Sequence, residues 1–187
     1  MPAPTSTANE ASAPKVRILA LVVLALVAVC VFAIDQFAKF LVVENLSERQ
    51  PVEVIGQLVQ FYFVKNAGAA FSLGSGSTWI FAIIASAVAV FIVIFAPRIR
   101  SLAWAVLFGL LLGGNLGNLS DRLFREPGFG VGHVVDFIQI QFFPAIFNVA
   151  DMAIVASMVV FIVLTVRGVG LLGKQIPAPI VETTDVA

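Results

Sequence analysis

Long runs of apolar residues without a charged side chain dominate the pattern of the sequence. Each run is close to the length of about 17 to 25 residues with which an α-helix crosses a lipid bilayer. The runs are continuous stretches of Val, Leu, Ala, Ile and Phe, whereas a membrane-spanning strand alternates apolar and polar positions. The pattern therefore predicts four membrane-spanning helices, at residues 18–34, 79–96, 102–120 and 152–166.

The first apolar run has features of a secretory signal. Lys15 and Arg17 precede it, and VAVC at residues 27–30 resembles a lipoprotein processing site. The residue before Cys30 is Val29, however, where such sites have a small residue, and no A-x-A motif ends the run. We therefore expect this helix to remain as an uncleaved anchor.

The cationic residues near the helix ends predict the orientation, because Lys and Arg concentrate in the cytoplasmic connections of membrane proteins. They are Lys15, Arg17, Arg98, Arg100, Arg167 and Lys174. All of them fall on one side if four helices alternate in direction. We expect both termini to be cytoplasmic and two larger loops to lie outside the membrane.

These outer loops, residues 35–78 and 121–148, differ in composition. The first mixes β-branched and aromatic residues with loose alternation, which is typical of a small sheet, here one resting at the membrane surface. The second is richer in Gly, Phe and Pro. The predicted fold is a membrane all-α core of four transmembrane helices, with a small extracytoplasmic β-sheet and a second extracytoplasmic loop or helix.

The two ends of the chain differ from this core. Residues 1–14 are rich in Ala, Pro, Ser and Thr, and both this segment and residues 171–187 are typical of disordered ends. We expect both ends to be disordered cytoplasmic tails. The remaining residues, 15–170, are predicted to form a single transmembrane domain.

Composition supports the membrane assignment and excludes several classes of function. The chain is 60% hydrophobic and only 12% charged, which is too little polar surface for a soluble globule. Eleven basic residues balance eleven acidic ones, so a nucleic-acid binder is not expected. One cysteine and one histidine, Cys30 and His133, rule out a disulfide scaffold and a metal site of ordinary composition. We expect no metal and no other cofactor.

The aspartates give the main indication of function. In the predicted topology four of them fall at the outer face of the membrane, namely Asp35, Asp121, Asp136 and Asp151. A carboxylate at membrane depth is costly, about 2.5 to 3.5 kcal/mol at a helix centre, so it persists for a function or for a specific pairing. The cluster therefore predicts either a reaction centre or a buried ionic network at that face.

Two of these aspartates have partners close in sequence. Asp35 and Lys39 are four residues apart, so on a continuing helix they can neutralise each other, and a structural pairing is as well supported as a functional one. Polar residues recur at three- and four-residue steps on one helical face, namely Asn115, Asn118, Asp121 and Arg122. We expect one of the acids to orient an arginine, which leaves Arg122 or Asn118 to bind a ligand.

The other two aspartates, Asp136 and Asp151, lie in apolar surroundings without a neighbouring cation. If the fold brings them together they must share a proton, which makes the pair a general acid and a general base at once. Asn66 stands in KNAGAAFSL, where small residues such as Gly68 permit close approach of a ligand. Spacing alone favours a simpler interpretation of that segment, a tight turn that ends a strand.

Five sequence blocks together resemble the bacterial lipoprotein signal peptidase family, also called signal peptidase II. The resemblance covers residues 16–170. The blocks are DQFAK, NAGAAFSL, GGNLGNLSDR, VVDFI and FNVAD, in this order along the chain. No single block is specific, but five in sequence across four matching hydrophobic runs make coincidence improbable. Met152 departs from the usual pattern, where a small hydroxyl residue is expected after the last aspartate.

The resemblance implies an aspartic endopeptidase of the bacterial inner membrane, with its active site at the extracytoplasmic face. Such an enzyme removes the signal peptide from diacylglyceryl-modified prolipoproteins by cutting before the lipidated cysteine. Its implied partners are lipidated prolipoproteins and membrane lipids, and we expect a monomer that the family inhibitor globomycin blocks.

The resemblance also assigns roles to residues. Asp136 and Asp151 are implied to be the catalytic dyad. Asn66, Asn118 and Arg122 are implied to bind the substrate backbone. The residues implied to support the site are Asp35, Lys39, Gly68, Asp121 and Asn148.

Two rival functions fit the sequence less well than a peptidase of this kind. A small proton-coupled membrane transporter also carries membrane aspartates, but it predicts polar groups near the membrane midplane, where these helices have no charge. A peptidase with a Ser/Lys pair could use Lys39 or Lys65, but Lys39 has an acid partner and no serine stands beside Lys65.

Overall fold

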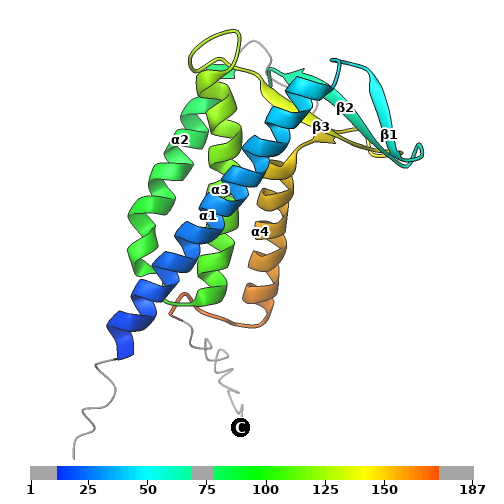
Figure 1. Ribbon diagram of the computed structural model, residues 1–187. Helices are drawn as coiled ribbons and strands as arrows, with labels where there is room; N and C mark the ends of the chain where they lie inside the picture. Colours follow the sequence, from blue (N-terminus) through cyan, green and yellow to red (C-terminus); the bar gives the residue numbers. More distant parts are fainter. Residues whose placement is uncertain (1–11, 69–77, 173–187) are drawn as a thin grey trace, which may run out of the picture.

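The structure is a computed structural model that describes residues 12–68 and 78–172. Four helices form an elongated bundle, and each is long and apolar enough to cross a membrane (Figure 1). They are α1 (Ser12–Asn45), α2 (Thr78–Phe95), α3 (Leu102–Phe124) and α4 (Val149–Val166), with a short 3₁₀ helix, η2 (Ala96–Arg98), after α2. The four predicted membrane-spanning helices are therefore confirmed.

Two helices run further than the apolar pattern predicts. Helix α1 continues past Asp35 and Lys39 to Asn45, so the first outer loop begins about ten residues later than expected. Helix α3 continues past residue 120 to Phe124. In both cases the polar residues that end the apolar run are buried and have partners inside the protein, so they give the helix no reason to stop.

The ends of the described chain also differ from the prediction. Helix α1 begins at Ser12, inside the predicted N-terminal tail, and the described chain runs to residue 172. Backbone N–H groups of Arg100 and Ser101 donate to the carbonyl of Leu171, which ties the segment after α4 to the turn before α3. The rest of both predicted tails lies outside the described residues.

Helix α3 is the centre of the bundle and packs against α1, α2 and α4. Glycines permit this close packing. A Cβ atom added to Gly113 would lie 2.6 Å from the carbonyl oxygen of Ala28 in α1. One added to Gly117 would lie 2.6 Å from the Asp35 carboxylate. The small residues therefore bring the backbone of α3 within contact distance of its neighbours and of the polar residues at one end.

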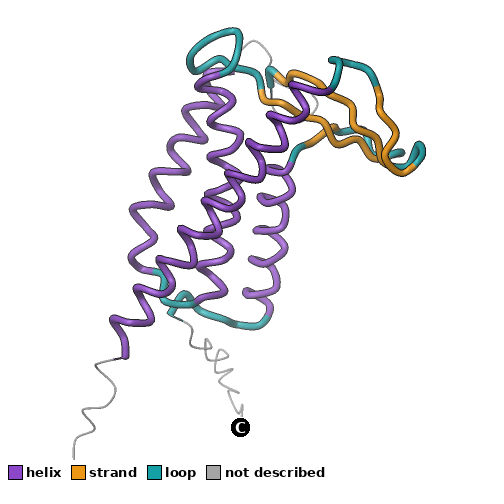
Figure 2. Tube along the Cα trace, in the orientation of Figure 1, coloured by secondary structure: helices purple, strands orange, loops and turns teal. Residues whose placement is uncertain are grey.

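A four-stranded antiparallel sheet extends sideways from one end of the bundle (Figure 2). Its strands, in spatial order, are β1 (Pro51–Ile55), β2 (Val59–Asn66), β3 (Val134–Ile140) and β4 (Ile146–Phe147). The predicted sheet in the first loop is confirmed, but the second loop adds two strands to it instead of a separate loop or helix. Its segment VVDFI is β-branched and apolar around Asp136, and it pairs with β2.

Two apolar clusters hold the helices and the sheet together. The first lies within the bundle and includes Leu24 of α1, Ile92 of α2 and Leu112 of α3. The second joins Val42, at the outer part of α1, to Val135 and other buried residues of the sheet. The extension of α1 beyond Asp35 therefore supplies the surface on which β3 rests, and this fixes the position of Asp136 relative to the helices.

Candidate active site

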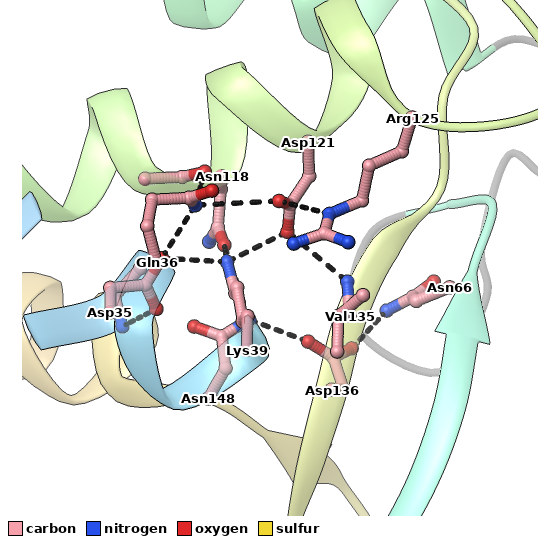
Figure 3. Close-up of polar contacts among 12 residues, drawn as sticks. Asp35, Gln36, Lys39, Asn66, Asn118, Asp121, Arg125, Val135, Asp136 and Asn148 are labelled. Carbon is pink, nitrogen blue, oxygen red and sulfur yellow. Dashed lines mark hydrogen bonds and ion pairs between the residues drawn. The ribbon is translucent and has the colours of Figure 1, made fainter. Parts of the chain in front are cut away.

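The polar residues singled out in the sequence lie together where the sheet meets the helices (Figure 3). Helix α1 contributes Asp35 and Lys39, and α3 contributes three residues that lie on adjacent turns. Strands β2 and β3 and the start of α4 supply the others. The full set is Asp35, Lys39, Asn66, Gly68, Asn118, Asp121, Arg122, Asp136, Asn148 and Asp151.

Asp136, in the middle of β3, is buried and 3% exposed. Its carboxylate accepts two hydrogen bonds from side-chain amides, one from Asn66 Nδ2 at 2.8 Å and one from Asn148 Nδ2 at 2.6 Å. Burial raises the pKa of Asp136 from its ordinary value of 3.8 to about 7, and the nearby Asp151 carboxylate acts in the same direction, against the two amide hydrogen bonds. This carboxyl group therefore holds a proton near neutral pH.

Asp151 lies in the first turn of α4, where it forms a capping box with Asn148. The side-chain oxygen of Asn148 accepts from the backbone N–H of Asp151 at 3.0 Å, and the Asp151 carboxylate accepts from the backbone N–H of Asn148 at 3.1 Å. Asn118 Nδ2 donates to the other carboxylate oxygen at 2.8 Å. These three hydrogen bonds fix the orientation of the Asp151 carboxylate at the start of α4.

Asn148 links the two carboxyl groups. While its side-chain oxygen caps α4, its Nδ2 donates both to Asp136 and to Asn118, the latter at 3.1 Å. Both aspartates line a single pocket of about 730 Å³. In the described part of the chain neither carboxylate forms an ion pair. The fold therefore places two carboxyl groups that accept hydrogen bonds from side-chain amides at one open site.

Lys39 is fully buried beside this pocket and has three partners. Its ammonium lies 2.8 Å from a carboxylate oxygen of Asp35, 2.8 Å from one of Asp121 and 2.9 Å from the side-chain oxygen of Asn118. The expected pairing of Asp35 with Lys39 is confirmed. The second carboxylate on the same ammonium comes from a residue 82 positions away, and no local spacing could have indicated it.

Asp35 and Asp121 also accept hydrogen bonds from backbone N–H groups of α4 and β3. These are the elements that carry Asp151 and Asp136. Asp35 accepts from the backbone N–H of Ala150, next to Asp151, at 2.8 Å. Asp121 accepts from the backbone N–H of Val135, next to Asp136, at 3.2 Å. The ion-pair cluster of Asp35, Lys39 and Asp121 therefore fixes α4 and β3 at the residues adjacent to the two carboxyl groups in the pocket.

The acid that orients an arginine is Asp121, but the arginine is Arg125 and not Arg122. Arg125 Nε donates to Asp121 at 2.6 Å from one helical turn away. Sequence reasoning missed Arg125 and also Gln36, whose amide reaches both Asp35 and the carbonyl of Gly117. The i, i+4 spacing of Asp121 and Arg125 was the signal available for that ion pair.

Arg122 instead faces the pocket. Its Nη2 donates to the carbonyl of Gly68 at 2.8 Å, and its guanidinium lies over the ring of Phe81 at 5.1 Å. Within the described residues its buried Nη1 has no hydrogen-bond partner. Asn66 donates to Asp136 and accepts from the backbone N–H of Gly68, so it shapes the chain after β2 and also contacts a carboxyl group of the pocket.

The pocket combines this polar end with an apolar wall from α4 that includes Met152, Ile154 and Val155. Among the described residues no three His, Cys, Asp or Glu side chains gather as a metal ion would require. The two lysines considered for a Ser/Lys peptidase are both in ion pairs, Lys39 as above and Lys65 with Glu126. The site can bind an apolar segment with a polar bond held at the two carboxyl groups.

Comparisons with known proteins agree with the resemblance. A family model described as signal peptidase (SPase) II matches residues 27–167. The lipoprotein signal peptidase of Leifsonia xyli subsp. xyli is 62% identical over 173 residues, which are 91% of this chain and 80% of that protein. The one of Streptomyces coelicolor is 48% identical over 146 residues, 78% of this chain and 71% of that protein.

Solved structures show the same likeness. Two bacterial membrane enzyme structures superpose on this fold with TM-scores of 0.69 and 0.66, at 28% and 30% sequence identity. The first comparison covers 82% of this chain and 92% of that chain, and the second covers 76% and 91%.

Proposed function

Because the chain belongs to the signal peptidase II family, and is a multi-pass membrane peptidase that removes signal peptides from prolipoproteins, we propose that Asp136 and Asp151 are its catalytic dyad. The observation that carries this proposal is the bridge formed by Asn148, which binds one carboxylate through its side chain and the other through its backbone within a single pocket. The comparisons lend no support to a transporter.

In this proposal the two carboxyl groups have different roles. Asp136 holds the proton, because burial raises its pKa to about 7, and Asp151 is the ionised partner, because two neighbouring carboxyl groups that share one proton leave one of them charged. Asp151 takes a proton from water while the water oxygen bonds to the scissile carbonyl carbon. Asp136 gives its proton to the carbonyl oxygen, which becomes a hydroxyl group of a tetrahedral intermediate.

The second step reverses these proton transfers. The carbon–nitrogen bond breaks, Asp151 returns its proton to the leaving amine, and the hydroxyl proton goes back to Asp136. The products are the signal peptide, with a new carboxyl end, and a lipoprotein that begins with the lipidated cysteine. No acyl-enzyme forms, so the reaction needs one water molecule and the two carboxyl groups.

Arg122, Asn66 and Asn118 are proposed to hold the substrate backbone at the dyad. Arg122 is the best supported of the three, since its buried Nη1 is a donor that a peptide carbonyl can satisfy. Asn66 and Asn118 line the same pocket but already donate to the carboxylates, so they also orient Asp136 and Asp151.

We also propose the setting of the enzyme in the cell. Cationic residues at the end of the bundle away from the sheet favour cytoplasmic termini in a bacterial inner membrane, with the dyad at the extracytoplasmic face. We expect a monomer, because the site takes every proposed residue from one chain, and inhibition by globomycin, as in the family. Labelling of a cysteine placed at Arg98 or at Gly128, each in a Cys30→Ala background, tests the orientation, and only the second should react from outside intact cells.

The dyad itself is tested by Asp136→Asn and Asp151→Asn, assayed on a lipidated prolipoprotein and on its unlipidated counterpart. Each variant should fold and insert but lose cleavage by about 10³-fold or more, because an amide cannot exchange the proton. The matched control is Asp185→Asn, which changes an aspartate far from the site in the sequence. Wild-type cleavage in either dyad variant would remove that residue from the mechanism.

A further inference from the structure

A second hollow, of about 400 Å³, lies at the outer part of the sheet. It is formed by the hairpin that joins β1 to β2 and by the end of β3 with the loop that follows. Four glutamines line it, namely Gln57, Gln60, Gln139 and Gln141. None of its lining residues carries a charge, in contrast to the ionic network around the dyad.

The backbone around the glutamines is fixed by the sheet, and their side-chain amides take no part in holding the fold together. Gln60 and Gln139 are directly opposite each other in the ladder between β2 and β3. The backbone N–H of Gln141 donates to the carbonyl of Leu58 at 2.9 Å, which ties the loop to the hairpin. In the described part of the chain none of the four side-chain amides forms a hydrogen bond, so all four offer a donor and an acceptor.

The loop that borders the hollow contains a residue whose backbone conformation is unfavourable for its type. Phe142 adopts a φ of 69° and is 92% exposed. A bulky side chain rarely takes this conformation, and such positions cluster at binding sites where the surrounding structure enforces them. Here the backbone hydrogen bonds of Gln141 and Phe143 on either side of Phe142 hold the loop.

The hollow adjoins the catalytic pocket. Ile140 and Phe143 line both of them. Asp136 is four residues before Ile140 on β3, a distance of roughly 13 Å along an extended strand. Side chains alternate along a strand, so Ile140 shares the face of Asp136 whereas Gln139 lies on the opposite face. A peptide that leaves the dyad along β3 therefore passes over Ile140, at the end of the strand, to reach the glutamines.

We propose that this glutamine-lined hollow binds the segment of the prolipoprotein that follows the lipidated cysteine, as an extended peptide whose backbone pairs with the four amides. The proposal rests on the assignment of Asp136 and Asp151 as the dyad. A glutamine amide matches the N–H and C=O groups of a peptide backbone, whatever the side chains of that peptide are.

The chemistry of the two hollows favours this occupant over the other parts of the substrate. The apolar signal segment and the lipid chains suit the catalytic pocket, which has an apolar wall on α4 that includes Ile154 and Val155. An anionic lipid headgroup requires Lys or Arg, and the lining of the second hollow has neither. The peptide backbone beyond the cysteine is the part of the substrate that remains for the second hollow, and neutral amides can pair with its N–H and C=O groups.

The test uses two lipidated peptides that share a signal segment and cysteine and end either two or ten residues after that cysteine. The full-length enzyme should show a KM about fivefold lower for the longer peptide, with the same kcat, since two or more net hydrogen bonds are added. The double variant Gln60→Leu/Gln139→Leu should lose this difference. Its kinetics on the shorter peptide should equal those of the wild type, which also reports that it folds.

Gln50→Leu is the matched control, because Gln50 is exposed on the same side of the bundle but outside the hollow. It should keep the fivefold preference for the longer peptide. Equal KM values for the two peptides in the wild type, or an equal rise for both peptides in the double variant, would overturn the proposal. Failure of the dyad assignment is separate, since it appears as activity of Asp136→Asn on the shorter peptide.

Discussion

Two pairs of aspartates lie at the same end of this bundle and differ in what they touch. Asp35 and Asp121 share the buried ammonium of Lys39, at 2.8 Å each. Asp136 and Asp151 accept hydrogen bonds from amides and have no cation within ion-pair distance among the described residues. The first pair is charge-compensated and closed, and the second is uncompensated and open to a pocket.

This difference between the two pairs of aspartates indicates how a membrane enzyme can hold uncompensated carboxyl groups in place. A compensated pair is suited to hold structure, and here each of its aspartates accepts a backbone N–H next to one member of the dyad, at Val135 or Ala150. An uncompensated pair must share a proton, which is what acid–base chemistry requires. The ion-pair cluster thus positions the proposed dyad and does not neutralise it.

The largest effect that this comparison predicts is on stability, from Lys39→Met. The change leaves Asp35 and Asp121 buried without their shared cation, so the free energy of unfolding should fall by about 3–5 kcal/mol. Unfolding of the purified enzyme in detergent measures it. Lys65→Met is the control, because Lys65 pairs with Glu126 at the surface and should contribute less than about 1 kcal/mol. Equal stability of the two variants would show that the cluster does not hold the fold.

The next effect is on the pH dependence of catalysis. Asp136 must be protonated to act as the acid and its pKa is raised to about 7, so kcat/KM should fall roughly tenfold per unit above about pH 7. It should also fall on the acid side as Asp151 takes up a proton, which gives a bell-shaped profile that belongs to the pair. A profile that is flat from pH 6 to 9 would contradict the role given to Asp136.

The raised pKa of Asp136 also makes the free energy of unfolding depend on pH. The dependence has the opposite sign to that of an ion-paired aspartate, whose pKa is lowered. Asp136 binds its proton more tightly in the folded chain than in the unfolded chain, so stability should decrease as the pH rises from about 4 to about 7. Asp136→Asn should remove this component of the pH dependence. Its persistence in that variant would assign the dependence to another group.

A smaller effect is expected at Arg122, the cation that belongs to the pocket instead of the ion-pair cluster. Arg122→Lys removes the planar guanidinium, whose two nitrogens can serve Gly68 and a substrate carbonyl together, so KM should rise about tenfold with a smaller change in kcat. Arg125→Lys is the matched control and should keep the wild-type KM, since Arg125 contacts Asp121 and does not line the pocket.

The sequence predicted the parts of the molecule that depend on local pattern. Apolar runs of sufficient length located all four helices, and the i, i+4 spacing identified the pair of Asp35 and Lys39. The end of α1 was placed too early, because two of the three partners of buried Lys39, Asp121 and Asn118, come from another helix. The strands of the second loop were missed for the same reason, since VVDFI becomes a strand by pairing with β2.

The candidate site was predictable as a set of residues but not as an arrangement. From the residues alone, pairing of Asp136 with Asp151 was one possibility among several, and only the resemblance to a family singled it out. Asn148 shows why, because its bridge depends on β3 and the start of α4 meeting side by side. Contacts of this kind are set by the packing of distant segments, which leaves no periodic signal in the chain.

The smallest effect is expected on stability, from a change of Arg125, the partly exposed residue that pairs with Asp121. Arg125→Gln removes a hydrogen bond to Asp121, but Lys39 still compensates that carboxylate, so the free energy of unfolding should fall by about 1 kcal/mol or less. Arg49→Gln, at an exposed ion pair with Glu48 of 3.9 Å, is the control and should be neutral. A loss as large as that of Lys39→Met would mean that Asp121 needs both cations. The ion-pair cluster would then extend to the surface, and the contrast between a closed pair and an open pair of aspartates would no longer hold.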